Sequence, residues 1–201
     1  FIAGREKRID RQILLEKMKT SPYRPMRGEI IEARMLTDKE KFFRIELEEN
    51  IELQHQPGQF VMASIFGYAE APISICSSPT DKGHFELTVR NVGVFTDKLH
   101  TLGEGDVLGI RGPFGKGFPV DNMFGYDAVI VAGGLGIVPL RSLIRYIMYN
   151  RNDFGNVQIL LGCKTPNDLL FGQETKEWMR RAEIKFNCTV DRADPDWKGN
   201  V

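Results

Sequence analysis

The chain has 201 residues, of which 42% are hydrophobic and 27% charged, so it can bury a core in one large domain or two small ones. Lysine plus arginine and aspartate plus glutamate number 27 each. Because this balance provides no overall field for nucleic acid or an anionic membrane, both kinds of partner are disfavoured.

Cysteine usage points to a reducing compartment. Cys76, Cys163 and Cys188 are widely spaced and contain no C-x-x-C pair, which argues against a disulfide framework and against a metal site within this chain. The longest apolar run, 128–140, is interrupted by glycines and too short to span a bilayer. Residues 1–10 lack the pattern of a signal peptide. We therefore expect a cytoplasmic protein without a membrane span.

Residues 1–22 differ from the rest of the chain. Ile9, Ile13, Leu14 and Met18 recur near one face of a possible helix, with charges on the other positions. This pattern predicts an N-terminal amphipathic extension, which packs either on its own domain or on a partner.

From residue 23 to residue 120 the pattern is that of short strands. Six segments are rich in β-branched and aromatic residues, several with period-two alternation: "GEIIEARML", "FFRIELEE", "QFVMASIF", "ISICSS", "HFELTVRN" and "DVLGIRGPF". One helical segment, "FTDKLHTL", interrupts them. Six short strands at this spacing predict an antiparallel barrel or sandwich.

After "GPFGKGFPVDN" (112–122) strands and helices alternate, which predicts a parallel α/β domain over residues 121–201. The continuous apolar segment "YDAVIVAGG" is predicted to be buried on both faces of the sheet. Only three strands fit before Val201, so we expect this domain to be C-terminally incomplete. The predicted fold class is a β-barrel followed by a partial parallel-sheet α/β domain.

The strongest local motif is "AVIVAGGLGIVPLRSLI". A strand runs into Gly133, Gly134 and Gly136, and Pro139 follows in the first turn of a helix. Glycines at such a turn let backbone amides approach a pyrophosphate, and the helix N-terminus adds partial positive charge. The alternative is a glycine-rich turn that binds nothing.

Open α/β sheets bind ligands at the carboxyl ends of their strands. Gly162, Cys163 and Lys164 follow the second strand, and Asp191 and Arg192 follow the third. Lys164 either pairs with a 2′-phosphate or is a solvated loop residue. Cys163 is expected to be a small buried residue rather than a nucleophile, because no histidine partner is evident. The three histidines are scattered and expected at the surface.

The ordered motifs "PGQF", "PISICSSP", "VRNVGVFT", "GPFGKGFP" and "AGGLGIVP" resemble the ferredoxin–NADP reductase superfamily over residues 25–201. Within it, the chain is most similar to electron-transfer subunits. These are the gamma (diaphorase) subunit of cytoplasmic NiFe hydrogenases or sulfhydrogenases and the corresponding electron-transfer subunit of anaerobic sulfite reductase. The resemblance implies an FAD-binding barrel over residues 23–120 and an NAD(P)-binding domain over residues 121–201.

The resemblance also implies site residues. Ser74 matches a serine of the family's flavin motif and is expected to act catalytically near flavin N5, whereas Ala71 and Ile73 replace the family's arginine and aromatic residue. Arg90 is either the compensating cation or an exposed strand residue. The implied FAD set is Pro72, Ile73, Ser74, Val89, Arg90, Gly93, Val94, Phe95 and Thr96. The implied NAD(P) set is Gly133, Gly134, Leu135, Gly136, Pro139, Gly162, Cys163, Lys164 and Asp191.

The mechanism implied by the family is hydride transfer from NAD(P)H to flavin N5, followed by release of single electrons to an iron–sulfur centre. Expected partners are the iron–sulfur and catalytic subunits of a redox complex of the hydrogenase or sulfite reductase type. Such relatives carry a C-terminal [2Fe–2S] site with four cysteines, which the 201 residues do not include. Two alternatives remain: a stand-alone flavin or ferredoxin reductase, and a non-catalytic assembly subunit whose flavin site has decayed.

Overall fold

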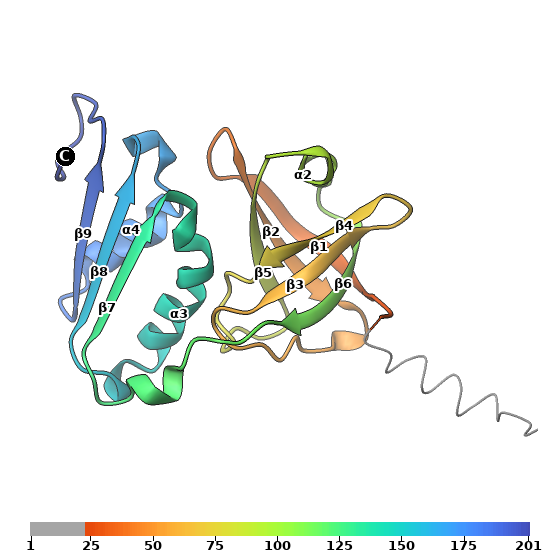
Figure 1. The fold of residues 1–201 in the computed structure, drawn as a ribbon, viewed down its shortest axis with the longest axis horizontal. Coiled ribbons are helices and arrows are strands. Elements are labelled where there is room, and N and C mark those ends of the chain that lie inside the picture. Colours follow the sequence, from red (N-terminus) through yellow and green to blue (C-terminus); the bar gives the residue numbers. More distant parts are fainter. Residues whose placement is uncertain (1–22) are drawn as a thin grey trace, which may run out of the picture.

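The computed structural model describes residues 23–201 as two lobes, an antiparallel barrel and a smaller parallel sheet with helices (Figure 1). The predicted fold class is confirmed. The amphipathic extension predicted for residues 1–22 lies outside the described residues.

Six strands and one helix form the first lobe. The strands follow the order β4-β3-β6-β1-β2-β5, and all neighbours are antiparallel. The two ends of this sheet meet where Ile75 bridges to Leu87, so the sheet closes into a barrel. The elements are β1 (Met26–Met35), β2 (Glu40–Leu47), β3 (Phe60–Ile65), β4 (Ala69–Ser74), β5 (Phe85–Arg90), α2 (Val94–His100) and β6 (Val107–Phe114).

Strand alternation fills the barrel interior. Side chains such as Ile30, Phe43, Ile45 and Leu87 are fully buried there. Full burial of an aliphatic or phenyl side chain contributes about 1.5–3 kcal/mol. Phe42 points the opposite way and belongs to the apolar core of the second lobe, so the two lobes pack directly on each other.

The strand predicted over residues 73–78 lies earlier in the chain, at β4 (Ala69–Ser74). Gly67, with φ 73°, makes the tight turn after β3, and this hairpin places Pro72 opposite Met62. Proline has no amide to donate and is tolerated on a strand at the end of a sheet. The serine-rich residues after Ile75 instead leave the sheet and turn toward the second lobe.

The second lobe is a parallel sheet in the order β7-β8-β9. Its elements are β7 (Ala128–Gly133), α3 (Ile137–Tyr149), β8 (Val157–Cys163), α4 (Gly172–Arg180) and β9 (Ile184–Val190). Helix α3 lies on the side of the sheet that faces the barrel (Figure 1). Short 3₁₀ turns cover Glu48–Asn50, Val120–Met123, Gly134–Gly136, Arg151–Asp153 and Pro166–Asp168.

The prediction that β7 is buried on both faces is wrong for the described part of the chain. Ala128, Ile130 and Ala132 are buried, but Val129 and Val131 are 65% and 66% exposed. The apolar residues of α3 and α4 pack on one face of the sheet only, and no element among residues 23–201 covers the other side of β7. Within the same residues, no helix is long and apolar enough to cross a membrane.

Candidate functional site

A cavity of about 510 Å³ lies between the two lobes. The barrel contributes Ala71–Ser74 from β4 and Thr88–Arg90 from β5, together with Val92 and Thr96. The second lobe contributes Leu135, Gly136, Val138 and Pro139 from the loop after β7 and the start of α3. The structure therefore gathers six of the nine residues predicted for the flavin, from Pro72 to Thr96, around one cavity.

The chemistry of this cavity suits a flat, largely apolar ring system. Its walls are mostly aliphatic, with hydroxyl groups from Ser74, Thr88 and Thr96 and a single charged side chain, that of Arg90, among its described lining residues. Ligand pockets typically combine such apolar walls with a few polar groups that fix orientation. Ala71 and Ile73 stand where the family has an arginine and an aromatic ring, and none of the described residues that line the cavity is aromatic. The residues present fit a flavin ring, held by aliphatic contacts.

Arg90 is neither an isolated cation nor a simple exposed strand residue. Its guanidinium forms an ion pair with Glu40, whose carboxylate is almost completely buried and also accepts a hydrogen bond from Thr37. Arg90 lines both this cavity and the neighbouring one. It can therefore interact with an anionic group at their junction.

The loop Gly93–Thr96, which belongs to the implied FAD set, is held by the Thr96 hydroxyl. This oxygen accepts hydrogen bonds from the amides of Val92 and Gly93, both at 2.9 Å, and donates to the Gly93 carbonyl at 2.8 Å. Gly93, Val94 and Phe95 do not line either cavity, and Phe95 packs on the barrel core. Of the four predicted loop residues, only Thr96 reaches the cavity wall.

A second cavity, of about 800 Å³, adjoins the first and shares Arg90, Val92 and Leu135 with it. It lies at the carboxyl ends of the parallel strands, where such sheets bind ligands. Seven of the nine residues predicted for NAD(P) line it: Gly133, Gly134, Leu135, Gly162, Cys163, Lys164 and Asp191. The other two, Gly136 and Pro139, line the first cavity instead.

The glycines at the end of β7 leave room at this second cavity. A Cβ atom added to Gly133 or Gly134 would meet nothing within 4 Å. Gly134 has a φ of +47°, a conformation that side chains with a Cβ rarely adopt. The backbone is thus exposed where a ligand can approach it closely.

Sequence reasoning missed Lys39 and Asp168, which also line the second cavity. Lys39 lies in the loop between β1 and β2, and its carbonyl accepts the Asn91 amide at 2.8 Å. A hydrogen bond from Thr165 lowers the pKa of Asp168, and the charges of Lys39 and Lys164 lower it further. The only sequence signal for Lys39 was the turn "TDKE", which by itself indicates no ligand.

The thiols near the cavities are not activated nucleophiles. Burial raises the pKa of Cys163 to about 12 and that of Cys76 to about 11. The prediction that Cys163 is a small buried residue is confirmed. The prediction of surface histidines is wrong for His55, which is 7% exposed, because its ring is held between the carbonyls of Leu53 and Ser77.

Comparison with known proteins agrees with this architecture. Residues 27–118 match the oxidoreductase FAD-binding domain family, and residues 130–201 match the oxidoreductase NAD-binding domain family. The chain belongs to the ferredoxin–NADP reductase superfamily of FAD- and NAD-binding oxidoreductases, as its motifs predict. A ferredoxin NADP⁺ reductase from Neisseria gonorrhoeae, solved with bound FAD and NADP, shares its fold. That structure has a TM-score of 0.72 and 20% identity, over 87% of this chain and 71% of that one.

Two relatives from Pyrococcus furiosus are more similar in sequence. The gamma subunit of sulfhydrogenase 2 is 42% identical over 86% of this chain, and the gamma subunit of sulfhydrogenase 1 is 42% identical over 89%. The chain spans 60% and 63% of the length of these two relatives. The predicted similarity to hydrogenase gamma subunits is confirmed.

Proposed function

We propose that the chain is an FAD-containing electron-transfer subunit that exchanges electrons between NAD(P)H and the iron–sulfur centres of a larger redox complex. The observation that carries this proposal is the pair of adjoining cavities between the lobes, which share Arg90, Val92 and Leu135. One cavity suits an apolar ring and the other exposes glycine backbone at the ends of parallel strands. Such an arrangement can bring the flavin ring and the nicotinamide ring into contact.

In this proposal the first cavity holds the flavin. Bound there, FAD would supply the step from two-electron to one-electron chemistry. Pro72 and Ile73 support the ring from the barrel side, and Leu135 and Pro139 limit access of water from the other side. Ser74 offers the hydroxyl that orients the ring, and Arg90 offers charge to the phosphates.

The second cavity would hold the nicotinamide nucleotide. Gly133 and Gly134 allow its phosphates to approach the backbone, while Lys39 and Lys164 provide positive charge at the rim. Asp191 is placed to accept hydrogen bonds from a ribose. We assign residues 23–120 to the FAD-binding unit and residues 121–201 to the NAD(P)-binding unit.

The similarity to sulfhydrogenase gamma subunits supports a hydrogenase type of complex. We propose iron–sulfur and catalytic subunits as the partners, and a cytoplasmic location. A [2Fe–2S] centre in a further part of the protein would receive or supply the single electrons.

The test is reconstitution followed by reduction. The purified protein, incubated with FAD and freed of excess, should show the paired flavin absorption bands, and NADH or NADPH should bleach them under anaerobic conditions. Affinity purification from the native host should recover iron–sulfur subunits with it. Protein that binds no flavin would refute the proposal in favour of an assembly role. Protein that is bleached but copurifies with no subunit would favour a stand-alone reductase.

A further inference from the structure

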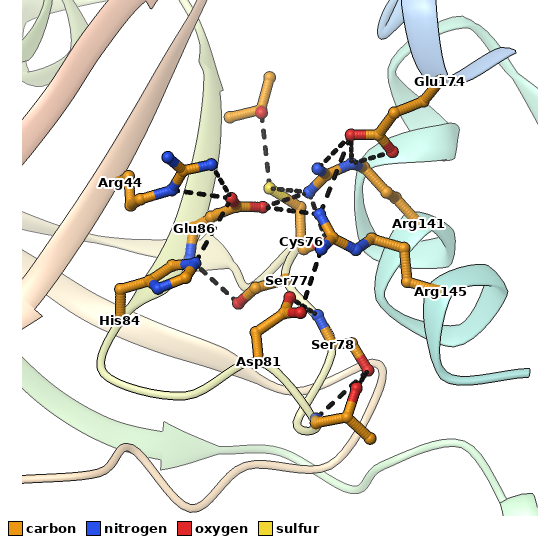
Figure 2. Close-up of polar contacts among 12 residues, drawn as sticks. Arg44, Cys76, Ser77, Ser78, Asp81, His84, Glu86, Arg141, Arg145 and Glu174 are labelled. Carbon is orange, nitrogen blue, oxygen red and sulfur yellow. Dashed lines mark hydrogen bonds and ion pairs between the residues drawn. The ribbon is translucent and has the colours of Figure 1, made fainter. Parts of the chain in front are cut away.

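A cluster of buried charges lies where the lobes meet (Figure 2). Glu86 of β5 is fully buried and faces Arg141 of α3, whose side chain is 2% exposed, with Arg141 Nη1 and Glu86 Oε2 2.6 Å apart. Arg44 of β2 approaches the other carboxylate oxygen at 2.9 Å. Buried ions are stable only when each is paired, so this cluster requires the two lobes to be docked.

Arg141 joins three separate segments through one guanidinium. Besides Glu86, it donates through Nη1 to the carbonyl of Cys76 at 2.8 Å and through Nε to Glu174 of α4 at 2.9 Å (Figure 2). Its guanidinium also stacks over the ring of Phe171, 4.6 Å from the centroid. A planar group with five fixed donors can make these contacts together, whereas a lysine ammonium on a flexible stem cannot.

These contacts lie close to both walls of the first cavity. Cys76 is two residues beyond Ser74, at the end of the barrel wall. Arg141 is two residues beyond Pro139, at the end of the opposite wall. Arg141 therefore links the segment that follows the wall Pro72–Ser74 to the helix that follows the wall Leu135–Pro139. Arg145, one turn further along α3, adds ion pairs to Asp81 and Glu86 of the barrel lobe.

We propose that Arg141 is a positioning residue: through Cys76 and Glu86 it sets the distance between the two cavity walls, and so the alignment of nicotinamide and flavin. This inference rests on the proposed function. A misplacement of about 1 Å between reacting groups can reduce a rate about 100-fold. Arg141 lines neither cavity, so it acts through the walls rather than by touching a ligand.

The first experiment uses the cofactor-free protein. Spin labels on cysteines introduced at Lys98 of α2 and Lys176 of α4, both exposed, report the separation of the lobes by pulsed electron resonance. The parent should give one narrow distance distribution, and Arg141→Gln a broad one. Arg141→Lys, which keeps the charge but not all three contacts, should broaden it as well and serves if Arg141→Gln does not fold. A distribution unchanged in both folded variants, or in Arg141→Lys alone if only that variant folds, would overturn the proposal.

The second experiment measures the FAD-loaded protein. In Arg141→Lys, the rate constant for flavin reduction by saturating NAD(P)H should fall about 10- to 100-fold, with the FAD Kd changed less than about threefold. Arg181→Gln, which removes an exposed arginine of the same lobe, is the matched control and should behave like the parent. An unchanged rate constant would overturn the positioning role while leaving the proposed function intact. A parent that binds no FAD would refute the function, and the label distances would still decide whether Arg141 holds the lobes.

Discussion

Glu40 and Arg90 face each other as direct cross-strand partners on β2 and β5, and their side chains form an ion pair beside both cavities. Glu40 is 3% exposed, so its carboxylate depends on this partner. A phosphate arriving at the junction would meet an arginine that is already oriented.

The first prediction concerns this pair. Arg90→Gln should raise the FAD Kd about tenfold, because a charge-assisted contact to phosphate is lost. Glu40→Gln keeps a polar side chain but frees the guanidinium, and it should leave the FAD Kd unchanged or lower it. Titration calorimetry or flavin fluorescence can measure both values. Equal FAD Kd values for Arg90→Gln and the parent would show that Arg90 pairs with Glu40 and does not contact FAD.

The second prediction separates ligand access from stability at two glycines. Gly133→Val places its side chain in open space at the second cavity, so it should raise the KM for NAD(P)H about tenfold and change the free energy of unfolding by less than about 0.5 kcal/mol. Gly28→Ala is the contrasting variant, because its Cβ would lie 2.7 Å from Cγ2 of Ile45 in the barrel core. It should cost about 1–3 kcal/mol of stability and leave KM unchanged. If both variants changed KM equally, Gly133 would not mark a nucleotide site.

The third prediction addresses the choice of nucleotide. Lys164→Gln should raise the KM for NADPH about five- to tenfold and leave the KM for NADH unchanged, if its ammonium contacts a 2′-phosphate. Lys39→Gln should raise both values, because Lys39 approaches from the barrel side and is assigned to phosphates common to both nucleotides. Steady-state kinetics with both nucleotides distinguish the two roles. Equal effects of Lys164→Gln on NADH and NADPH would assign it to a shared phosphate.

The fourth prediction is a pH dependence centred on Glu86. Burial alone would raise the pKa of this carboxyl, but Arg141, with help from Arg44 and Arg145, lowers it below its ordinary value of 4.5. A carboxyl with a depressed pKa in the folded state contributes stability above its unfolded pKa and loses that contribution as the pH falls through the folded value. The free energy of unfolding should therefore decline below about pH 4.5.

The matching variant is Glu86→Gln. It should be less stable at pH 7 by about 3–5 kcal/mol, because Arg141 loses a buried counterion. Its stability should also depend less on pH below about 4.5, because the carboxyl whose pKa is lowered is gone. Urea unfolding at several pH values measures both effects, with exposed Glu177→Gln as the control. Parallel pH profiles for Glu86→Gln and the parent would contradict the assignment.

The fifth prediction is that the three thiols are inert in the folded protein. With the pKa of Cys163 near 12 and that of Cys76 near 11, little thiolate exists at pH 8. Alkylation by iodoacetamide should be at least about 100-fold slower than in unfolded protein, although Cys163 lines the second cavity. Rapid modification of Cys163 alone would reveal a thiolate that the structure does not account for.

The fold follows from local sequence signals, and most of the residues that line both cavities follow from the resemblance to the ferredoxin–NADP reductase superfamily. Alternation identifies the barrel strands, and the run into Gly133, Gly134 and Gly136 marks the turn from β7 to α3. The position of β4 could not be predicted in this way, because Pro72 weakens its strand pattern. The proline is tolerated because β4 lies at one end of the strand order. That place is decided by the closure of the barrel rather than by nearby residues.

The charge cluster around Arg141 could not be predicted from the sequence either. Arg141 stands in a helix where an arginine ordinarily faces solvent, and its partners Glu86 and Cys76 lie 55 and 65 positions earlier. Only the docking of the lobes makes these residues neighbours. The place of Lys39 at the second cavity could not be predicted for the same reason, since a hairpin of the barrel carries it to a cavity at the edge of the other lobe.

The Thr96 hydroxyl has a further consequence for the energetics of cofactor exchange. Its bonds to the amides of Val92 and Gly93 hold the loop through groups of the chain itself. The conformational entropy of ordering this segment is thus lost before any cofactor arrives, and a pre-organised segment reduces the cost of association. Release of the flavin would leave this loop intact, so the protein could be emptied and refilled without local unfolding.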